Sequence, residues 1–257
     1  MDNPVRKGNH GALSKKAIAG LIFGTALLIG IIAAAIFVLT GRMQPDNAAL
    51  AALEGDDKVQ VVQQNDEIAF LGPDRDPDNT YGLVFYPGAK VDYRAYAPLL
   101  HKLASRGWVC IDVSMPLDLA ILDQDAATDA MSQYPQVEHW YIAGHSLGGA
   151  MGANYASSHA DSLEGLVLLA AYSTQDISSS SLDVLSVYGS NDGVLNRENY
   201  VSNRANLPDS AKELVISGGN HAQFGSYGEQ QGDGAAGISA EQQIAQTVRF
   251  IQKTTRQ

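Results

Sequence analysis

Hydrophobic positions near the N-terminus form one continuous run. Residues 17–40 are 24 residues without a charge. A helix of that length spans about 36 Å, which exceeds the roughly 30 Å hydrocarbon core of a bilayer. Every face of such a helix is apolar, which disfavours a helix in the core of a soluble domain. The pattern predicts one N-terminal transmembrane helix over 17–40.

A cleaved signal peptide is the main alternative for this segment. Its apolar region is usually shorter, and here the small residues at 33–35 are followed by four more apolar residues at 36–39. No cysteine follows that would carry a lipid anchor. The pattern therefore favours an uncleaved anchor, and cleavage stays the open alternative.

From Lys58 onward, short apolar runs alternate with segments of helical periodicity. The apolar runs predict strands, which are 59–62, 67–70, 82–86, 108–113, 140–143, 166–171, 184–188 and 213–216. The periodic segments predict helices, which are 93–106, a mainly helical stretch at 117–134, 148–159, 197–205 and a closing helix from 239. Runs such as LVLLAA are apolar on both faces, which is typical of parallel strands covered on both sides. The pattern predicts a doubly wound α/β domain with a mostly parallel sheet.

The closing helix carries both a start signal and a buried face. Ser239 and Gln242 have the spacing of a capping box. Ile244, Val248 and Ile251 fall on one face of the helix. We expect this face to pack against the sheet.

Charge divides the chain into parts with different surroundings. The net charge is −11, yet residues 1–42 hold five basic residues and one acidic residue. Basic residues before the apolar run place the N-terminus in the cytoplasm. The predicted organisation is a cytoplasmic basic tail (1–16), the transmembrane helix (17–40), a linker (41–57) that includes a short helix, and an extracytoplasmic α/β domain (58–257). The expected location is the cell membrane, with a single pass.

Composition excludes several classes of function. The acidic sequence, with a pI of about 4.8, argues against a nucleic-acid partner. One cysteine, Cys110, cannot form an intramolecular disulfide or a Cys-rich zinc module, and its place in a strand predicts a buried filler. No metal-binding, P-loop or G-x-G-x-x-G motif occurs, so we expect no metal, nucleotide or flavin cofactor.

The central chemical motif is a G-x-S-x-G sequence at residues 144–148. A predicted strand precedes it, and a helix with small residues follows it, as a nucleophile elbow requires. Glycines flank the serine because the turn between strand and helix is very tight. The motif predicts that Ser146 is a nucleophile. A glycine-rich turn without chemistry is the alternative.

A serine nucleophile needs a base and an acid that orients the base, in the chain order Ser, Asp or Glu, His. His221 follows the last predicted strand and is therefore the expected base. Asp192 follows the strand at 184–188 and is the expected acid. Asp176 and Asp183, in the preceding loop, are weaker candidates.

Backbone N–H groups near the serine should stabilise the developing oxyanion. The N–H of Leu147 directly follows the nucleophile, and Ala89 lies in the turn after the strand at 82–86. Lys90, Tyr93 and His145 are candidate substrate contacts.

The chain from Lys58 to its end resembles the α/β-hydrolase superfamily, and most closely its compact bacterial fold-5 type, which is related to dienelactone hydrolases. The segments that carry the resemblance are FYPGAKVDYRAYAPL, AGHSLGGAM, YGSNDGV and GGNHAQFGSYG, in that order. The resemblance implies that Ser146, Asp192 and His221 are nucleophile, acid and base. Dienelactone hydrolases use a cysteine nucleophile, so the serine here does not imply their substrate.

Two loops bear on access to this site. Between Ala171 and Val184 there is no room for a large cap domain, so we expect an open pocket. The polar, glycine-rich segment 223–238 is either a mobile flap beside the base or an exposed loop.

These observations predict a membrane-anchored, carboxylesterase-like serine hydrolase. Its expected substrate is a small ester, or an amide, cleaved through an acyl-enzyme, and its other partner is the membrane. The alternatives are a non-catalytic binding or scaffold protein with this fold and a protein whose main role is assembly in the membrane. The sequence does not specify the acyl group, the leaving group or the oligomeric state.

Overall fold

The computed structural model describes residues 41–64, 66–73 and 80–255, and Arg42–Gln257 belong to one compact unit. The predicted basic tail (1–16) and transmembrane helix (17–40) lie outside the described residues. Among the residues that are described, no helix is both long and apolar enough to cross a membrane.

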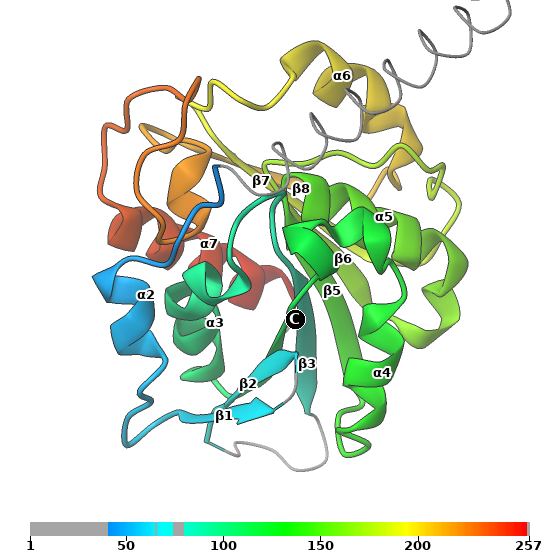
Figure 1. The fold of residues 1–257 in the computed structure, drawn as a ribbon. Coiled ribbons are helices and arrows are strands. Elements are labelled where there is room, and N and C mark those ends of the chain that lie inside the picture. The colour runs from blue at the N-terminus through cyan, green and yellow to red at the C-terminus, as the bar shows by residue number, and fades with distance from the viewer. Residues whose placement is uncertain (1–40, 65, 74–79, 256–257) are drawn as a thin grey trace, which may run out of the picture. The chain divides into compact units, whose positions relative to one another are not determined.

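The unit is built on an eight-stranded sheet with the strand order β1-β2-β4-β3-β5-β6-β7-β8 (Figure 1). The β1-β2 and β2-β4 pairs are antiparallel, whereas β3-β4, β3-β5, β5-β6, β6-β7 and β7-β8 are parallel. This confirms the mostly parallel sheet. The strands are β1 (Gln60–Gln64), β2 (Glu67–Leu71), β3 (Tyr81–Tyr86), β4 (Trp108–Val113), β5 (His139–His145), β6 (Gly165–Leu169), β7 (Asp183–Gly189) and β8 (Lys212–Ile216).

Helices cover both faces of the sheet. In Figure 1, α3 and α7 lie on one side of the strands, and α4 and α5 lie on the other. Two separate clusters of buried apolar side chains fill the spaces between sheet and helices, one on each face. The helices are α2 (Asn47–Ala52), α3 (Ala97–Ala104), α4 (Ala126–Ser132), α5 (Leu147–Ser158), α6 (Arg197–Ser202) and α7 (Ala240–Thr255).

The closing helix follows its sequence signals. The Ser239 N–H donates to Gln242 Oε1, and the Gln242 N–H donates to Ser239 Oγ. Ile244, Val248 and Ile251 are buried. Both the capping box and the buried face of α7 are therefore confirmed.

The prediction of a mainly helical stretch at 117–134 is wrong in its first half. Two short 3₁₀ turns, Pro116–Asp118 and Ala120–Leu122, precede α4. Leu117 and Asp118 have φ values of 56° and 55°, which no right-handed helix accommodates. The side chains of Leu117, Ile121 and Leu122 are more than half exposed. The apolar spacing there does not mark a buried helix face.

Residues after Gly41 are joined to the rest of the unit. Arg42 makes ion pairs with Asp92 and Asp118. Asp46 caps α2 with its side chain, and its N–H donates to the carbonyl of Ser226. The segment predicted as a linker thus contains ordered contacts from its second residue onward.

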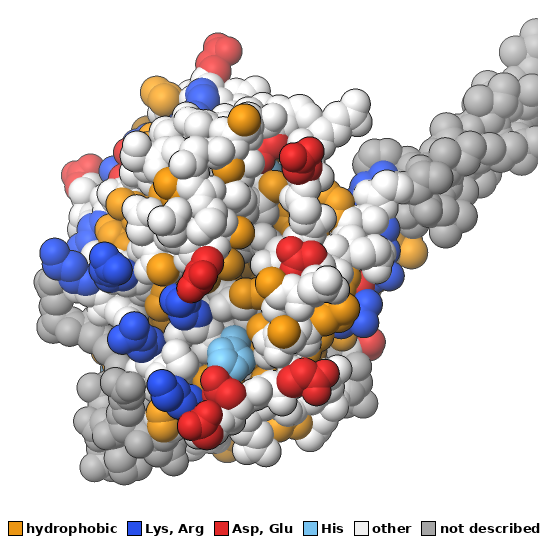
Figure 2. All heavy atoms as spheres, turned by 90° about the vertical axis from the view of Figure 1, so that its left-hand side faces the viewer, with side chains coloured by type: hydrophobic (Ala, Val, Ile, Leu, Met, Phe, Trp, Pro, Cys, Tyr) orange, Lys and Arg blue, Asp and Glu red, His pale blue; other side chains and the backbone are white. Residues whose placement is uncertain are grey.

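The face formed by α2, α3 and α7 carries charges of both signs. Figure 2 shows basic and acidic side chains close together there, with apolar side chains between them. This face has no field of a single sign that would attract a polyanion.

Candidate active site

The residues of the G-x-S-x-G motif form a sharp turn between β5 and α5. Ser146 has φ 53° and ψ −120°, a strained conformation for a residue with a side chain. Its N–H donates to the carbonyl of Leu169 on the neighbouring strand β6, at 2.9 Å. Ser146 is the single residue between the end of β5 at His145 and the start of α5 at Leu147. This is the local geometry expected of a nucleophile elbow.

Close backbone packing explains the two flanking glycines. A Cβ on Gly144 would lie 2.4 Å from the carbonyl carbon of Gly148. A Cβ on Gly148 would lie 2.2 Å from the carbonyl oxygen of Tyr86 on β3. Neither position has room for a side chain, so both glycines are required by the turn itself.

The predicted base and acid are in direct contact. His221 follows β8, Asp192 follows β7, and His221 Nδ1 lies 3.0 Å from Asp192 Oδ2. The other carboxylate oxygen, Oδ1, accepts the N–H groups of Val194 and Leu195 at 2.9 and 2.8 Å. Both side chains are almost fully buried. Oδ1 is thus held by backbone N–H groups of its own loop, and Oδ2 contacts the imidazole.

These contacts determine the charge of Asp192. Burial on its own would raise the pKa of this carboxyl, but the hydrogen bonds from His221, Leu195 and Val194 outweigh it and lower the pKa below its ordinary value. The carboxylate is therefore ionised at neutral pH, and His221 Nδ1 donates to it. This tautomer leaves His221 Nε2 as a proton acceptor.

Ser146 and His221 line the same cavity, which has a volume of about 400 Å³. None of the residues that line the cavity is an Asp, Glu, Lys or Arg, and His221 is the one histidine among them. The lining residues are Ser146, Leu147, Ala150, Met151, Ala170, Ala171, Tyr172, Thr174, Val194, Leu195, Asn196 and His221. The cavity suits an uncharged, largely apolar group placed against the serine.

The chain segment beside this cavity, between β6 and β7, is short. Residues 170–182 connect β6 directly to β7, with bends and turns and no helix. No cap domain is inserted at this point of the described chain.

Of the other predicted site residues, Leu147 lines this cavity, whereas Ala89, Lys90 and Tyr93 do not. Ala89 and Lys90 lie in the turn after β3, and Tyr93 begins the 3₁₀ helix Tyr93–Tyr96. Asp176 is exposed and bonds to its neighbour Ser178. Asp183 begins β7 and is therefore at the opposite end of that strand from Asp192.

His145 is buried beneath the elbow, with 1% of its surface exposed. Its Nδ1 lies 2.8 Å from the Tyr96 hydroxyl, which also accepts the N–H of Gly88 at 3.0 Å. Burial and the neighbouring His221 lower the pKa of His145 well below its ordinary value, so its ring is neutral. The Tyr96 hydroxyl thus links the elbow to the loop that contains Ala89, and no sequence motif marks this link.

The segment 223–238 is fastened to the site by Asp233, which the sequence analysis did not single out. Its carboxylate accepts N–H groups from the loops that carry Asp192 and His221. Among the described residues, no three His, Cys, Asp or Glu side chains form a group suited to a metal ion.

Comparison with solved structures shows the same fold at low sequence identity. A "predicted CIB-like hydrolase" from Thermoplasma acidophilum is 16% identical, with a TM-score of 0.52 over 76% of this chain and 98% of that chain. Est1E from Butyrivibrio proteoclasticus is 14% identical, with a TM-score of 0.55 over 78% and 100%. TT1662 from Thermus thermophilus is 12% identical, with a TM-score of 0.55 over 78% and 99%.

No curated protein matches the sequence. A family model described as "Alpha/beta hydrolase family" matches residues 82–245, which include β3 from its second residue, the elbow, Asp192 and His221. This match covers more than half of the chain. The chain therefore belongs to the alpha/beta hydrolase family.

Proposed function

We propose that the protein is a membrane-anchored serine hydrolase that cleaves carboxylic esters. The observation that carries the proposal is the contact of His221 with Asp192 at the wall of a cavity that Ser146 also lines. An ionised acid, an oriented imidazole and a serine on a strained turn are the parts of an acyl-transfer site.

In the proposed reaction, Ser146 Oγ attacks the ester carbonyl while His221 Nε2 accepts its proton. The imidazolium, paired with Asp192, then donates that proton to the leaving alcohol as the C–O bond breaks. Water repeats the cycle on the acyl-enzyme, releasing the acid and restoring Ser146. The N–H groups of Leu147 and Ala89 are proposed to bind the oxyanion, and each such donor contributes about 3 kcal/mol to barrier lowering.

The cavity lining supports an uncharged substrate. Ala150, Met151 and Leu195 present apolar surface, and a charged acyl group would lose its hydration without gaining an ionic partner. We therefore propose short or medium neutral acyl esters as substrates, with amides cleaved more slowly because an amine is a poorer leaving group.

Ester hydrolysis by the full chain in detergent tests this function. The Ser146→Ala variant should lose at least about 10⁴-fold in kcat on p-nitrophenyl esters, because the nucleophile is removed. It should also lose covalent labelling by a fluorophosphonate. Ser157→Ala, which removes an exposed serine of the same helix α5, is the matched control and should keep both.

Two results would contradict the function. Labelling that persists in Ser146→Ala would assign the reaction to another nucleophile. A wild-type protein that reacts with neither esters nor the probe would favour a non-catalytic binding protein with this fold.

We further propose that residues 17–40 anchor the protein in the cell membrane with the catalytic domain outside. The apolar segment ends at Thr40, and the compact unit begins at Arg42. The support for the anchor is the uncharged apolar run itself, which is long enough to span a bilayer, and the four basic residues that precede it.

Cysteine labelling tests this topology because Cys110 is buried. In intact cells, a membrane-impermeant maleimide should label Ser179→Cys, in an exposed loop of the domain, and should label Ser14→Cys only after lysis. The protein should stay in the membrane pellet after an alkaline wash. Release into the soluble fraction would contradict the anchor and favour a cleaved signal peptide.

A further inference from the structure

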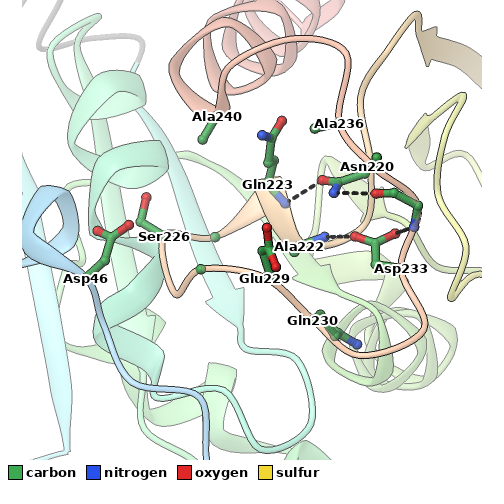
Figure 3. A pocket seen from close by; sticks show the side chains of 14 residues that line it. Asp46, Asn220, Ala222, Gln223, Ser226, Glu229, Gln230, Asp233, Ala236 and Ala240 are labelled. Carbon is green, nitrogen blue, oxygen red and sulfur yellow. Dashed lines mark hydrogen bonds between the residues drawn. The ribbon is translucent and has the colours of Figure 1, made fainter.

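In the glycine-rich segment between His221 and α7, the carboxylate of Asp233 accepts several backbone N–H groups. Asp233 Oδ2 accepts the N–H of Ala222 at 2.8 Å (Figure 3). Asp233 Oδ1 accepts the N–H of His221 at 3.2 Å and that of Gly193 at 3.0 Å. It also accepts the N–H of the adjacent Gly234 at 2.8 Å. Such bonds to an ionised acceptor are stronger than bonds between neutral groups.

The two loops that Asp233 joins are those that carry the base and the acid. His221 is itself one of the donors, and Gly193 directly follows Asp192 in the chain. The two loops also contact each other directly, because the Asn191 N–H donates to the carbonyl of Gly219 at 2.8 Å. Asp233 supplies one acceptor group common to both loops.

Residues next to Asp233 reinforce this attachment. The Asn220 side chain donates to the carbonyl of Gly234 at 2.9 Å, as Figure 3 shows, and the Asn191 side chain donates to that of Ala235 at 2.9 Å. A Cβ on Gly234 would lie 2.0 Å from the carbonyl oxygen of Asn191. This close packing does not fit a flap that opens over the base.

We propose that Asp233 is a positioning residue that holds the acid loop and the base loop together, so that His221 Nδ1 keeps its 3.0 Å contact with Asp192. Asp233 itself touches neither the cavity with Ser146 nor a reacting atom. The inference rests on the proposed serine-hydrolase function, which it extends by one residue.

Variants of Asp233 in the full chain test the proposal. Asp233→Ala should lower kcat on a p-nitrophenyl ester by about 10- to 100-fold with little change in KM, because a small displacement of the base impairs proton transfer. Asp233→Asn, which keeps the shape and one acceptor oxygen, should retain an intermediate kcat. Glu229→Gln removes a charge from an exposed position in the same segment and should stay within about twofold of wild type.

Added formate separates positioning from a loss of folding. A cavity of about 580 Å³ lies beside Asp233, so formate can reach the site that the missing carboxylate leaves. It should restore kcat of Asp233→Ala severalfold and have no effect on Asp192→Ala. The low-field proton resonance of His221 Nδ1–H should broaden in Asp233→Ala and sharpen again with formate.

The proposal is overturned if Asp233→Ala keeps the wild-type kcat. It is also overturned if kcat falls, formate restores nothing and the His221 resonance is unchanged. A wild-type protein without esterase activity would instead refute the proposed function, and the His221 resonance would still decide whether Asp233 positions the base.

Discussion

Two buried aspartates near the carboxyl ends of parallel strands have opposite surroundings. Asp192 follows β7 and bonds to His221, Val194 and Leu195. Asp112 is the penultimate residue of β4, and neither of its carboxylate oxygens has a hydrogen-bond partner among the described residues. The pKa of Asp192 is lowered, whereas burial, with a smaller contribution from Asp92, raises the pKa of Asp112 well above its ordinary value.

The comparison shows that a buried carboxyl is ionised only where hydrogen bonds replace its lost hydration. At Asp192 they do, and the carboxylate can stabilise an imidazolium. At Asp112 no hydrogen bond among the described residues compensates for burial, and burial favours the neutral acid. An aspartate near the end of a parallel strand is thus a candidate catalytic acid only when its loop supplies donors.

Replacing each aspartate by asparagine gives the largest expected contrast. Asp192→Asn should lower kcat on a soluble ester by about 10³- to 10⁴-fold, because an amide neither stabilises the imidazolium nor selects its tautomer. Asp112→Asn should stay within about threefold of wild type, since burial favours the neutral acid and the amide is a neutral group of the same shape. Equal losses in the two variants would mean that Asp112 also serves the reaction and would break the comparison.

The pH dependence of stability gives a smaller effect with opposite signs at the two sites. The pKa of Asp192 is lowered in the folded state, so its contribution is present above the unfolded pKa of about 3.9 and is lost as pH falls. The pKa of Asp112 is raised, so its contribution is complete below that unfolded pKa and is lost as pH rises.

Thermal unfolding of the full chain in detergent between about pH 2 and pH 8, a range that extends below the unfolded pKa, measures this contrast. Asp112→Asn should be more stable than wild type at neutral pH, with an advantage that shrinks toward acid. Asp192→Asn should be less stable at neutral pH, with a deficit that also shrinks toward acid. A destabilised Asp112→Asn at every pH would show that Asp112 has a partner in solution that compensates its burial.

Much of the fold could be predicted because its elements are encoded locally. The apolar strands, the capping box of α7 and the glycines of the elbow depend on residues close together in the chain. The stretch at 117–134 could not be predicted in the same way. Leu117 and Ile121 have the i, i+4 spacing of a helix, but the backbone has positive φ values at Leu117 and Asp118, and both apolar side chains are exposed.

The residues of the chain were enough to indicate the strand–helix alternation, the family and the chemical types of Ser146, Asp192 and His221. Folding decided which aspartate meets the imidazole: Asp192 does, while Asp183 begins the same strand at its other end. Folding also decided that Tyr96 reaches His145 and that Asp233 binds the backbone of two loops. These contacts join residues up to 49 positions apart, and no local pattern encodes them because their donors are backbone groups or side chains on separate elements.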